Sequence, residues 1–149
     1  MSNASSPEDE QAALNQKVQV LVYEIQEMEK TVTALQQSSE MLNLQRRDLL
    51  NSKETLENMK NREKGERVLV PLGSMLLVPF LLSGEDQTLL RAGSNVLVPT
   101  SFAESIAKLD EQAQSLENAF RQTSERAAMI YNQMRQKEAE LNALVGREQ

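Results

Sequence analysis

Few residues of this sequence have side chains that could carry out catalytic chemistry. The chain contains no His and no Cys, so the most common general base, imidazole metal ligands and thiolate nucleophiles are all missing. The adjacent carboxylates of Glu85 and Asp86 are of the type used in acid–base catalysis, but solvent exposure in a polar segment explains them. The sequence also lacks a G-x-x-x-x-G-K loop, a G-x-G-x-x-G motif and a Ser on a recognisable nucleophile elbow. We therefore expect no catalytic residue, no cofactor and no metal site.

The composition indicates a long, helical protein rather than a compact globule. Aromatic residues make up 3% of the 149 residues and there is no Trp, whereas a globular core of this size usually contains several large rings. The 16 basic residues are scattered among 22 acidic ones, so we expect no nucleic-acid partner. The N-terminal residues lack a basic region followed by an apolar run, and the absence of Cys suits a reducing interior, so we expect a cytoplasmic location.

The first long segment predicts a coiled-coil helix over residues 8–64, after a flexible tail over residues 1–7. Ser6 and Pro7 suit the start of this helix, and Gly65 suits its end. Apolar residues recur at every seventh position, which is typical of a coiled coil. These positions are Leu14, Leu21, Met28, Leu35, Leu42, Leu49 and Leu56. The interleaved seam begins apolar and then turns polar: Val18, Ile25, Val32, Ser39, Arg46 and Lys53.

The last long segment predicts a second coiled-coil helix over residues 101–145. Ser101 and Glu104 have the spacing of a capping box, and Gly146 follows the helix. One of its seams contains Ile106, Ala113, Phe120, Ala127, Met134 and Leu141. The other contains Leu109, Leu116, Thr123, Ile130, Lys137 and Leu144.

The two helices are joined by about 35 residues, so we expect them to fold back on each other in antiparallel order. In that register Val18, Leu21 and Ile25 lie opposite Met134, Leu141 and Leu144, and Phe120 lies near Ser39. The residues Val20, Val22, Tyr23, Met129 and Tyr131 are apolar but lie off the principal seam. Contiguous apolar surface of this kind marks either an interaction site at the tip or a broader local seam.

Residues 66–100 predict two β-hairpins that repeat at an offset of 20 residues. Gly73-Ser74 recurs as Gly93-Ser94, and "LLVP" at 76–79 recurs as "VLVP" at 96–99. Short apolar runs around Gly-Ser turns favour strands in hairpins. The fold class is therefore α+β and mostly α, with an antiparallel helical hairpin joined by two β-hairpins, in a single domain over residues 1–149.

The uncharged stretch at residues 68–84 has three conceivable roles. It is slightly shorter than a membrane-spanning helix and contains Pro71, Gly73 and Pro79, so we expect no membrane partner. Strands that are apolar on both faces are usually covered on both faces, and the chain offers little nearby to cover them. We favour a β-barrel completed by other subunits over a small autonomous sheet.

The element order and the stretch "LVPLGSMLLVP" resemble the α-class subunit of prefoldin, archaeal α or eukaryotic subunit-5-like, over residues 8 to about 145. The resemblance implies an ATP-independent holdase in a hexamer of two α and four β subunits. The hairpins would form a double barrel. The coiled-coil tips would hold unfolded polypeptides and deliver them to a group II chaperonin. The alternative is a structural scaffold or adaptor that uses the same barrel to assemble a complex.

Two sets of residues follow from this resemblance and from the apolar pattern. The candidates for contact with unfolded clients are Leu14, Val18, Leu21, Tyr23, Met134, Leu141 and Leu144. The candidates for oligomerisation are Val68, Leu69, Val70, Leu76, Leu77, Val78, Leu89, Leu90, Val96, Leu97 and Val98.

Overall fold

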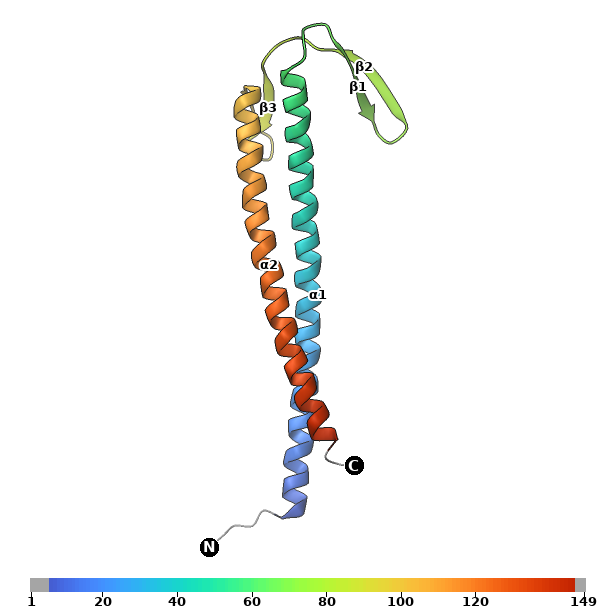
Figure 1. Cartoon of the computed structure of the whole chain (residues 1–149), viewed down its shortest axis with the longest axis vertical. Helices are drawn as coiled ribbons and strands as arrows, with labels where there is room; N and C mark the ends of the chain where they lie inside the picture. The colour runs from blue at the N-terminus through green and yellow to red at the C-terminus, as the bar shows by residue number, and fades with distance from the viewer. Residues whose placement is uncertain (1–5, 147–149) are drawn as a thin grey trace. The chain divides into compact units, whose positions relative to one another are not determined.

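The computed structural model describes residues 6–146 and contains two long helices and two β-hairpins (Figure 1). The order along the chain is α1 (Pro7–Lys60), β1 (Arg67–Leu72), β2 (Leu76–Leu81), β3 (Thr88–Arg91), β4 (Leu97–Thr100) and α2 (Phe102–Val145). These elements confirm the predicted fold class. Most of the tail predicted over residues 1–7 lies outside the described residues.

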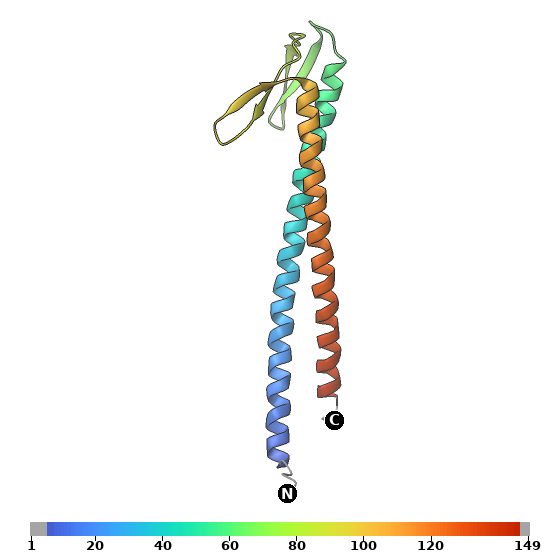
Figure 2. The same ribbon diagram turned by 90° about the vertical axis from the view of Figure 1, so that its left-hand side faces the viewer.

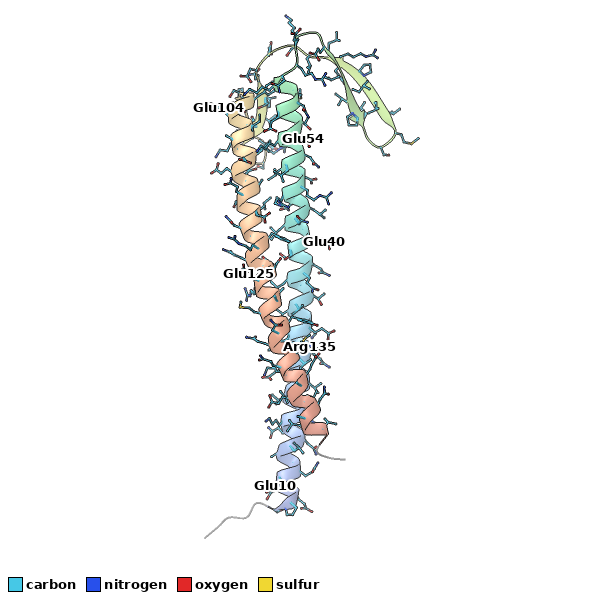
Figure 3. The ribbon with its side chains drawn as sticks, viewed as in Figure 1. Glu10, Glu40, Glu54, Glu104, Glu125 and Arg135 are labelled. Carbon is cyan, nitrogen blue, oxygen red and sulfur yellow. The ribbon has the colours of Figure 1, made fainter. Side chains whose placement is uncertain are left out.

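The chain divides into two compact units, and both helices contribute to each. The hairpin unit comprises residues 43–117, and the terminal unit comprises residues 1–42 and 118–149. Within each unit, α1 and α2 lie side by side in antiparallel order (Figure 2). Exposed charged side chains such as Glu40, Glu125 and Arg135 lie along the helix surfaces (Figure 3).

Side-chain caps define where the helices begin. The backbone N–H of Glu8 donates to Ser6 Oγ at 3.2 Å, and the N–H of Ser6 donates to Asp9 Oδ2 at 3.3 Å. The capping box predicted for α2 is present: the N–H of Glu104 donates to Ser101 Oγ at 3.2 Å, and the N–H of Ser101 donates to Glu104 Oε2 at 3.1 Å. Each pair satisfies two N–H groups that a helix start leaves without partners.

The helix α1 ends at Lys60, four residues before the predicted end at residue 64. The reason lies in Glu66, whose carboxylate accepts the backbone N–H of Glu63 at 2.8 Å and a hydrogen bond from Arg62 at 3.0 Å. These bonds stabilise a turn at residues 61–66, where the helix was predicted to continue to residue 64. Gly65 follows in the left-handed region, with a φ of 85°.

The apolar seam forms the core of the terminal unit. Leu21 and Val32 of α1 and Ala127 and Met134 of α2 are buried there. Their spacing matches the heptad positions of the sequence, and the small Ala127 side chain permits close approach of the backbones. Two ion pairs connect the helices in the same unit: Lys17 with Glu140 at 2.9 Å and Lys137 with Glu24 at 2.6 Å.

Polar pairs also join α1 to α2 within each unit. In the terminal unit Ser39 and Ser124 share a hydrogen bond of 3.2 Å. In the hairpin unit Arg46 pairs with Glu117 at 2.9 Å and Lys53 pairs with Asp110 at 2.8 Å. Successive members are seven residues apart on both helices, in opposite directions. The partner of Ser39 is therefore Ser124, which lies about one helical turn after Phe120 on α2. The sequence register had placed Phe120 near Ser39.

The four strands form two separate antiparallel sheets of two strands each. In the first hairpin Val70 lies opposite Val78, and in the second Leu90 lies opposite Val98. Both prolines of the first hairpin pair with leucines, as Leu69 with Pro79 and Pro71 with Leu77. The predicted strand–turn–strand repeat is thus confirmed.

Burial along α1 predicts unequal effects of two identical substitutions. Leu21 is 4% exposed and Leu44 is 52% exposed. We expect Leu21→Ala to lower the free energy of unfolding of the terminal unit by about 2–4 kcal/mol, because it leaves a cavity in the seam. Leu44→Ala, in the hairpin unit, should change the free energy of unfolding of its own unit by less than about 0.5 kcal/mol. Urea unfolding followed by helical circular dichroism measures both, and equal effects would contradict the seam assignment.

Candidate functional site

The hairpins expose a large amount of apolar surface within the hairpin unit. Most of the residues predicted for oligomerisation are exposed: Leu69, Val70, Leu76, Leu77, Leu89, Val96, Leu97 and Val98. Val68, Val78 and Leu90 are half-buried. Apolar patches of this kind mark interaction surfaces. Four further exposed residues were missed by the sequence analysis although they belong to the same apolar run: Leu72, Met75, Phe80 and Leu81.

A cluster of three hydroxyl groups fixes the second hairpin to α2. Thr88 of β3 and Thr100 of β4 share a hydrogen bond of 2.9 Å, and Thr100 shares one of 2.7 Å with Ser105. Thr88 and Ser105 are also hydrogen-bonded. Ser105 is 3% exposed, so its hydroxyl needs these partners to offset its lost hydration. Isolated Ser and Thr residues gave no sequence signal for this cluster.

The first hairpin is connected to the end of α1 by backbone hydrogen bonds. The N–H of Gly65 donates to the carbonyl of Leu82 at 2.9 Å, and the N–H of Leu82 donates to the carbonyl of Glu66 at 3.0 Å. Next to this junction Gly84 has a φ of 78°, and a Cβ there would lie 2.7 Å from Lys64 Cβ. Only glycine combines this backbone conformation with this close approach.

One of the two acids in the linker between the hairpins, Asp86, caps a helix. Asp86 Oδ1 accepts the backbone N–H of Phe102 at 2.8 Å, so this carboxylate caps the start of α2, where negative charge is favourable. Both acids line an open groove of about 430 Å³ together with Leu56, Met59 and Phe102. Within residues 6–146, no group of three or more acids is arranged to hold a metal ion.

The seven residues predicted for client contact fall into three classes of exposure. Leu21 and Met134 are buried in the seam of the terminal unit. Four are half-buried, namely Leu14, Val18, Leu141 and Leu144. Tyr23 is 64% exposed. Other exposed apolar residues of this unit are Val20, Val22, Met41, Met129, Tyr131 and Val145.

A shallow groove of about 350 Å³ lies beside Tyr23 in the terminal unit. Its apolar walls are Tyr23, Met28 and Ile130, and Glu24 lies at its margin together with Glu27, Thr31 and Gln133. A groove with apolar walls and polar residues beside them can accommodate an apolar side chain of another polypeptide.

The described part of the chain has no helix that is both long and apolar enough to cross a membrane. The helices carry charged residues throughout, and the most apolar segment forms strands.

Two long helices joined by two exposed hairpins define the class of fold, and comparison with known proteins identifies the family. The family model described as prefoldin subunit matches residues 28–147. The chain therefore belongs to the prefoldin family, which is a family of chaperones. The chain is 28% identical over 110 residues to prefoldin subunit alpha of Pyrococcus horikoshii, covering 73% of this chain and 74% of that one.

A second curated relative agrees on the class of subunit, and a solved structure has the same fold. Prefoldin subunit alpha of Methanopyrus kandleri is 26% identical over 106 residues, which are 71% of this chain and 68% of that one. Among solved structures, the filamentous PFD of Methanocaldococcus jannaschii matches with a TM-score of 0.68 and 20% identity, over 79% of this chain and 98% of that one. The chain is an α-class subunit of the prefoldin family.

Two glycine substitutions test the junction at Gly84. Gly84→Ala adds a strained positive φ and a clash with Lys64, whereas Gly73→Ala, at a φ of 71° with no neighbour within 4 Å, adds the strain alone. We expect a loss of about 1 kcal/mol in the stability of the hairpin unit for Gly73→Ala and roughly 3 kcal/mol or more for Gly84→Ala. Thermal unfolding of both variants measures the difference, and equal losses would refute the close approach.

The stability of the same junction should depend on pH through Glu66. The backbone N–H of Glu63 and the guanidinium of Arg62 hold the pKa of the Glu66 carboxyl below its ordinary value of 4.5. A lowered pKa gives stability that is present above the ordinary value and is lost as the pH falls through the folded value. We expect the turn at residues 61–66 to loosen in acid.

An NMR titration of the Glu66 carboxyl carbon measures this pKa directly. Arg62→Met should raise the pKa only in part, because the larger cause, the Glu63 N–H, remains. A Glu66 carboxyl that titrates at its ordinary value in the unaltered chain would show that the turn is not held by these bonds.

Proposed function

We propose that this chain is a subunit of an ATP-independent holdase, a hetero-hexamer of two copies of this chain and four β-class prefoldin subunits in the cytoplasm. The complex captures unfolded polypeptides on apolar surfaces of its coiled coils and delivers them to a group II chaperonin. The proposal rests on membership of the prefoldin family and on one observation: apolar side chains remain exposed in the terminal unit beside a seam that is already filled.

The contrast within α1 supports this reading. Leu21 is 4% exposed and occupies the seam, whereas its neighbours Val20 and Tyr23 are 49% and 64% exposed. An exposed apolar side chain gains free energy when another apolar surface covers it, at about 25 cal/mol per Å². Unfolded polypeptides expose such surface and folded ones largely do not, so these residues favour non-native clients.

The predicted client residues take different parts in this proposal. Tyr23 contacts clients directly through the groove that it shares with Ile130. The half-buried residues Leu14, Val18, Leu141 and Leu144 supply the adjoining apolar surface. Leu21 and Met134 hold the two helices together and would reach a client only if the helices separated.

Assembly uses the hairpins. Their exposed apolar side chains, with Met75 91% exposed and Leu81 72% exposed, are the surface that the β-class subunits and the second copy cover. Several coiled coils around one cavity then act together, because linked weak contacts raise the effective affinity without new contacts. Passive capture of this kind requires no nucleotide, in agreement with the missing phosphate-binding loop.

A matched pair of double variants tests the client surface. Val20→Ser with Tyr23→Ser removes two exposed apolar side chains three residues apart, and Met41→Ser with Leu44→Ser does the same at 62% and 52% exposure elsewhere on α1. In the assembled complex, we expect the first variant to need about threefold more protein to suppress aggregation of a denatured client. The second should behave as the unaltered chain.

Two outcomes of this experiment would reject the proposal. Equal suppression by both double variants and the unaltered complex would remove the terminal unit from client binding. Failure of the intact complex to protect several unrelated denatured proteins, together with binding of one folded partner, would identify a scaffold instead. Transfer of a captured client to a purified group II chaperonin tests the delivery step separately.

A further inference from the structure

The groove beside Tyr23 in the terminal unit has an aromatic ring and a thioether in its walls. Tyr23 is 64% exposed, and Met28 and Ile130 are half-buried, so each side chain presents part of its surface to the groove. The groove volume of about 350 Å³ exceeds the roughly 150 Å³ that holds one benzene ring in a protein cavity. There is therefore space for an aromatic ring between an aromatic wall and a sulfur-containing wall.

The helical spacing of α1 places acids next to these two walls. Tyr23 and Glu27 are four residues apart, and so are Glu24 and Met28. Side chains four residues apart are neighbours on a helix surface, so Glu27 lies beside the Tyr23 ring and Glu24 lies beside Met28. Both carboxylates line the groove. Groups that only accept hydrogen bonds are thus adjacent to both the ring and the thioether.

Lysines neutralise these carboxylates without using all of their acceptor positions. Lys137 donates to Glu24 Oε2 at 2.6 Å, and Lys30 donates to Glu27 Oε1 at 2.7 Å. An ionised carboxylate has about four acceptor positions, so each one can accept a further hydrogen bond. Because each ion pair is neutral as a whole, a cationic client side chain gains little here, whereas a neutral N–H or O–H donor still finds an acceptor.

These walls favour an aromatic side chain over an aliphatic one of equal apolar area. A ring packed against another ring gains about two- to tenfold in affinity beyond burial, and contact between a ring and a thioether adds a similar factor. A leucine side chain gains burial alone. Tryptophan and tyrosine also carry an N–H or O–H donor at the edge of the ring, which phenylalanine lacks.

We propose that the groove beside Tyr23 selects aromatic side chains of unfolded clients, and above all tryptophan and tyrosine, whose N–H or O–H donates to Glu24 or Glu27. This inference rests on the proposed function and adds the chemical class of side chain that the site recognises. Tryptophan is highly buried on average in folded proteins, so the same preference directs the groove toward non-native chains.

Short peptides that differ at one central position test the selection. Three unstructured peptides carry leucine, phenylalanine or tryptophan at that position, and fluorescence anisotropy measures their binding to the complex of this chain with β-class subunits. We expect the tryptophan peptide to bind about tenfold more tightly than the leucine peptide, with the phenylalanine peptide between them. Equal affinities of the three peptides would overturn the proposal.

Two tyrosine-to-leucine variants separate recognition of the ring from apolar area. Tyr23→Leu keeps an apolar wall but removes its ring, and Tyr131→Leu does the same at a tyrosine that is 46% exposed in the same unit and does not line the groove. We expect Tyr23→Leu to reduce the preference for tryptophan over leucine to about threefold and to change the affinity of the leucine peptide by less than about twofold. Tyr131→Leu should leave the preference unchanged, and equal effects of the two variants would contradict selection by the Tyr23 ring.

A methylated indole tests the hydrogen bond to the acids. Replacing the indole N–H of the tryptophan peptide by N–CH3 keeps the ring and removes the donor. We expect the methylated peptide to bind about threefold more weakly, because the hydrogen bond to Glu24 or Glu27 is lost. Unchanged affinity would show that these carboxylates do not accept a hydrogen bond from the client.

Methyl NMR of the unaltered complex locates the bound ring. An aromatic ring shifts the resonance of a methyl group that lies over its face, and a leucine side chain does not. We expect the tryptophan peptide to shift the Met28 methyl resonance upfield and to leave that of Met129, which is 61% exposed in the same unit and outside the groove, unchanged. A shift of the Met129 resonance alone would place the ring elsewhere and overturn the proposal.

Aggregation assays separate this inference from the proposed function. If the unaltered complex does not protect denatured proteins from aggregation, the holdase function fails. If it protects them while the three peptides bind equally well, the aromatic preference alone fails.

Discussion

The two hairpins consist of strands that are apolar on both faces, and the chain has few side chains with which to cover them. Most of their leucines remain exposed, and Val68, Val78, Thr88 and Leu90 are only half-buried. A two-stranded sheet is marginal in water, so exposed leucines on such a sheet create a strong demand for a partner. This demand explains why the molecule is a subunit.

The polar pairs between the two helices fix their antiparallel register. A purely apolar seam tolerates sliding by whole heptads, since each apolar layer resembles the next. The pairs Ser39 with Ser124, Arg46 with Glu117 and Lys53 with Asp110 would all be broken by such a slide. Leaving partly buried polar groups without hydrogen-bond partners destabilises the folded state. The polar part of the seam therefore supports one register, while the apolar part in the terminal unit supplies most of the burial.

A filled seam also determines what remains for binding. Because Leu21, Val32, Ala127 and Met134 satisfy each other, apolar residues just off the seam stay in water and are available to other polypeptides. Contacts of this type are weak singly and nonspecific in geometry, which suits capture of chains without a defined structure. The hairpins differ from the coiled coil in that most of their apolar side chains remain exposed.

Spacing and hydropathy suffice to predict two coiled-coil helices, two hairpins and the capping box at Ser101, because these depend on local periodicity and on turn residues. The α class comes from the resemblance of the hairpin stretch to a known family. Prediction fails where a side chain's role depends on the distance to another segment. The heptad pattern places Leu21 in the seam and Tyr23 off it, but both are predicted for client contact, and only the structure separates the buried side chain from the exposed one. An acidic pair in a linker does not reveal that Asp86 caps α2 or that three separate hydroxyls meet at Ser105. Those roles arise from contacts between residues far apart in sequence, which come into being only when the helices and hairpins pack.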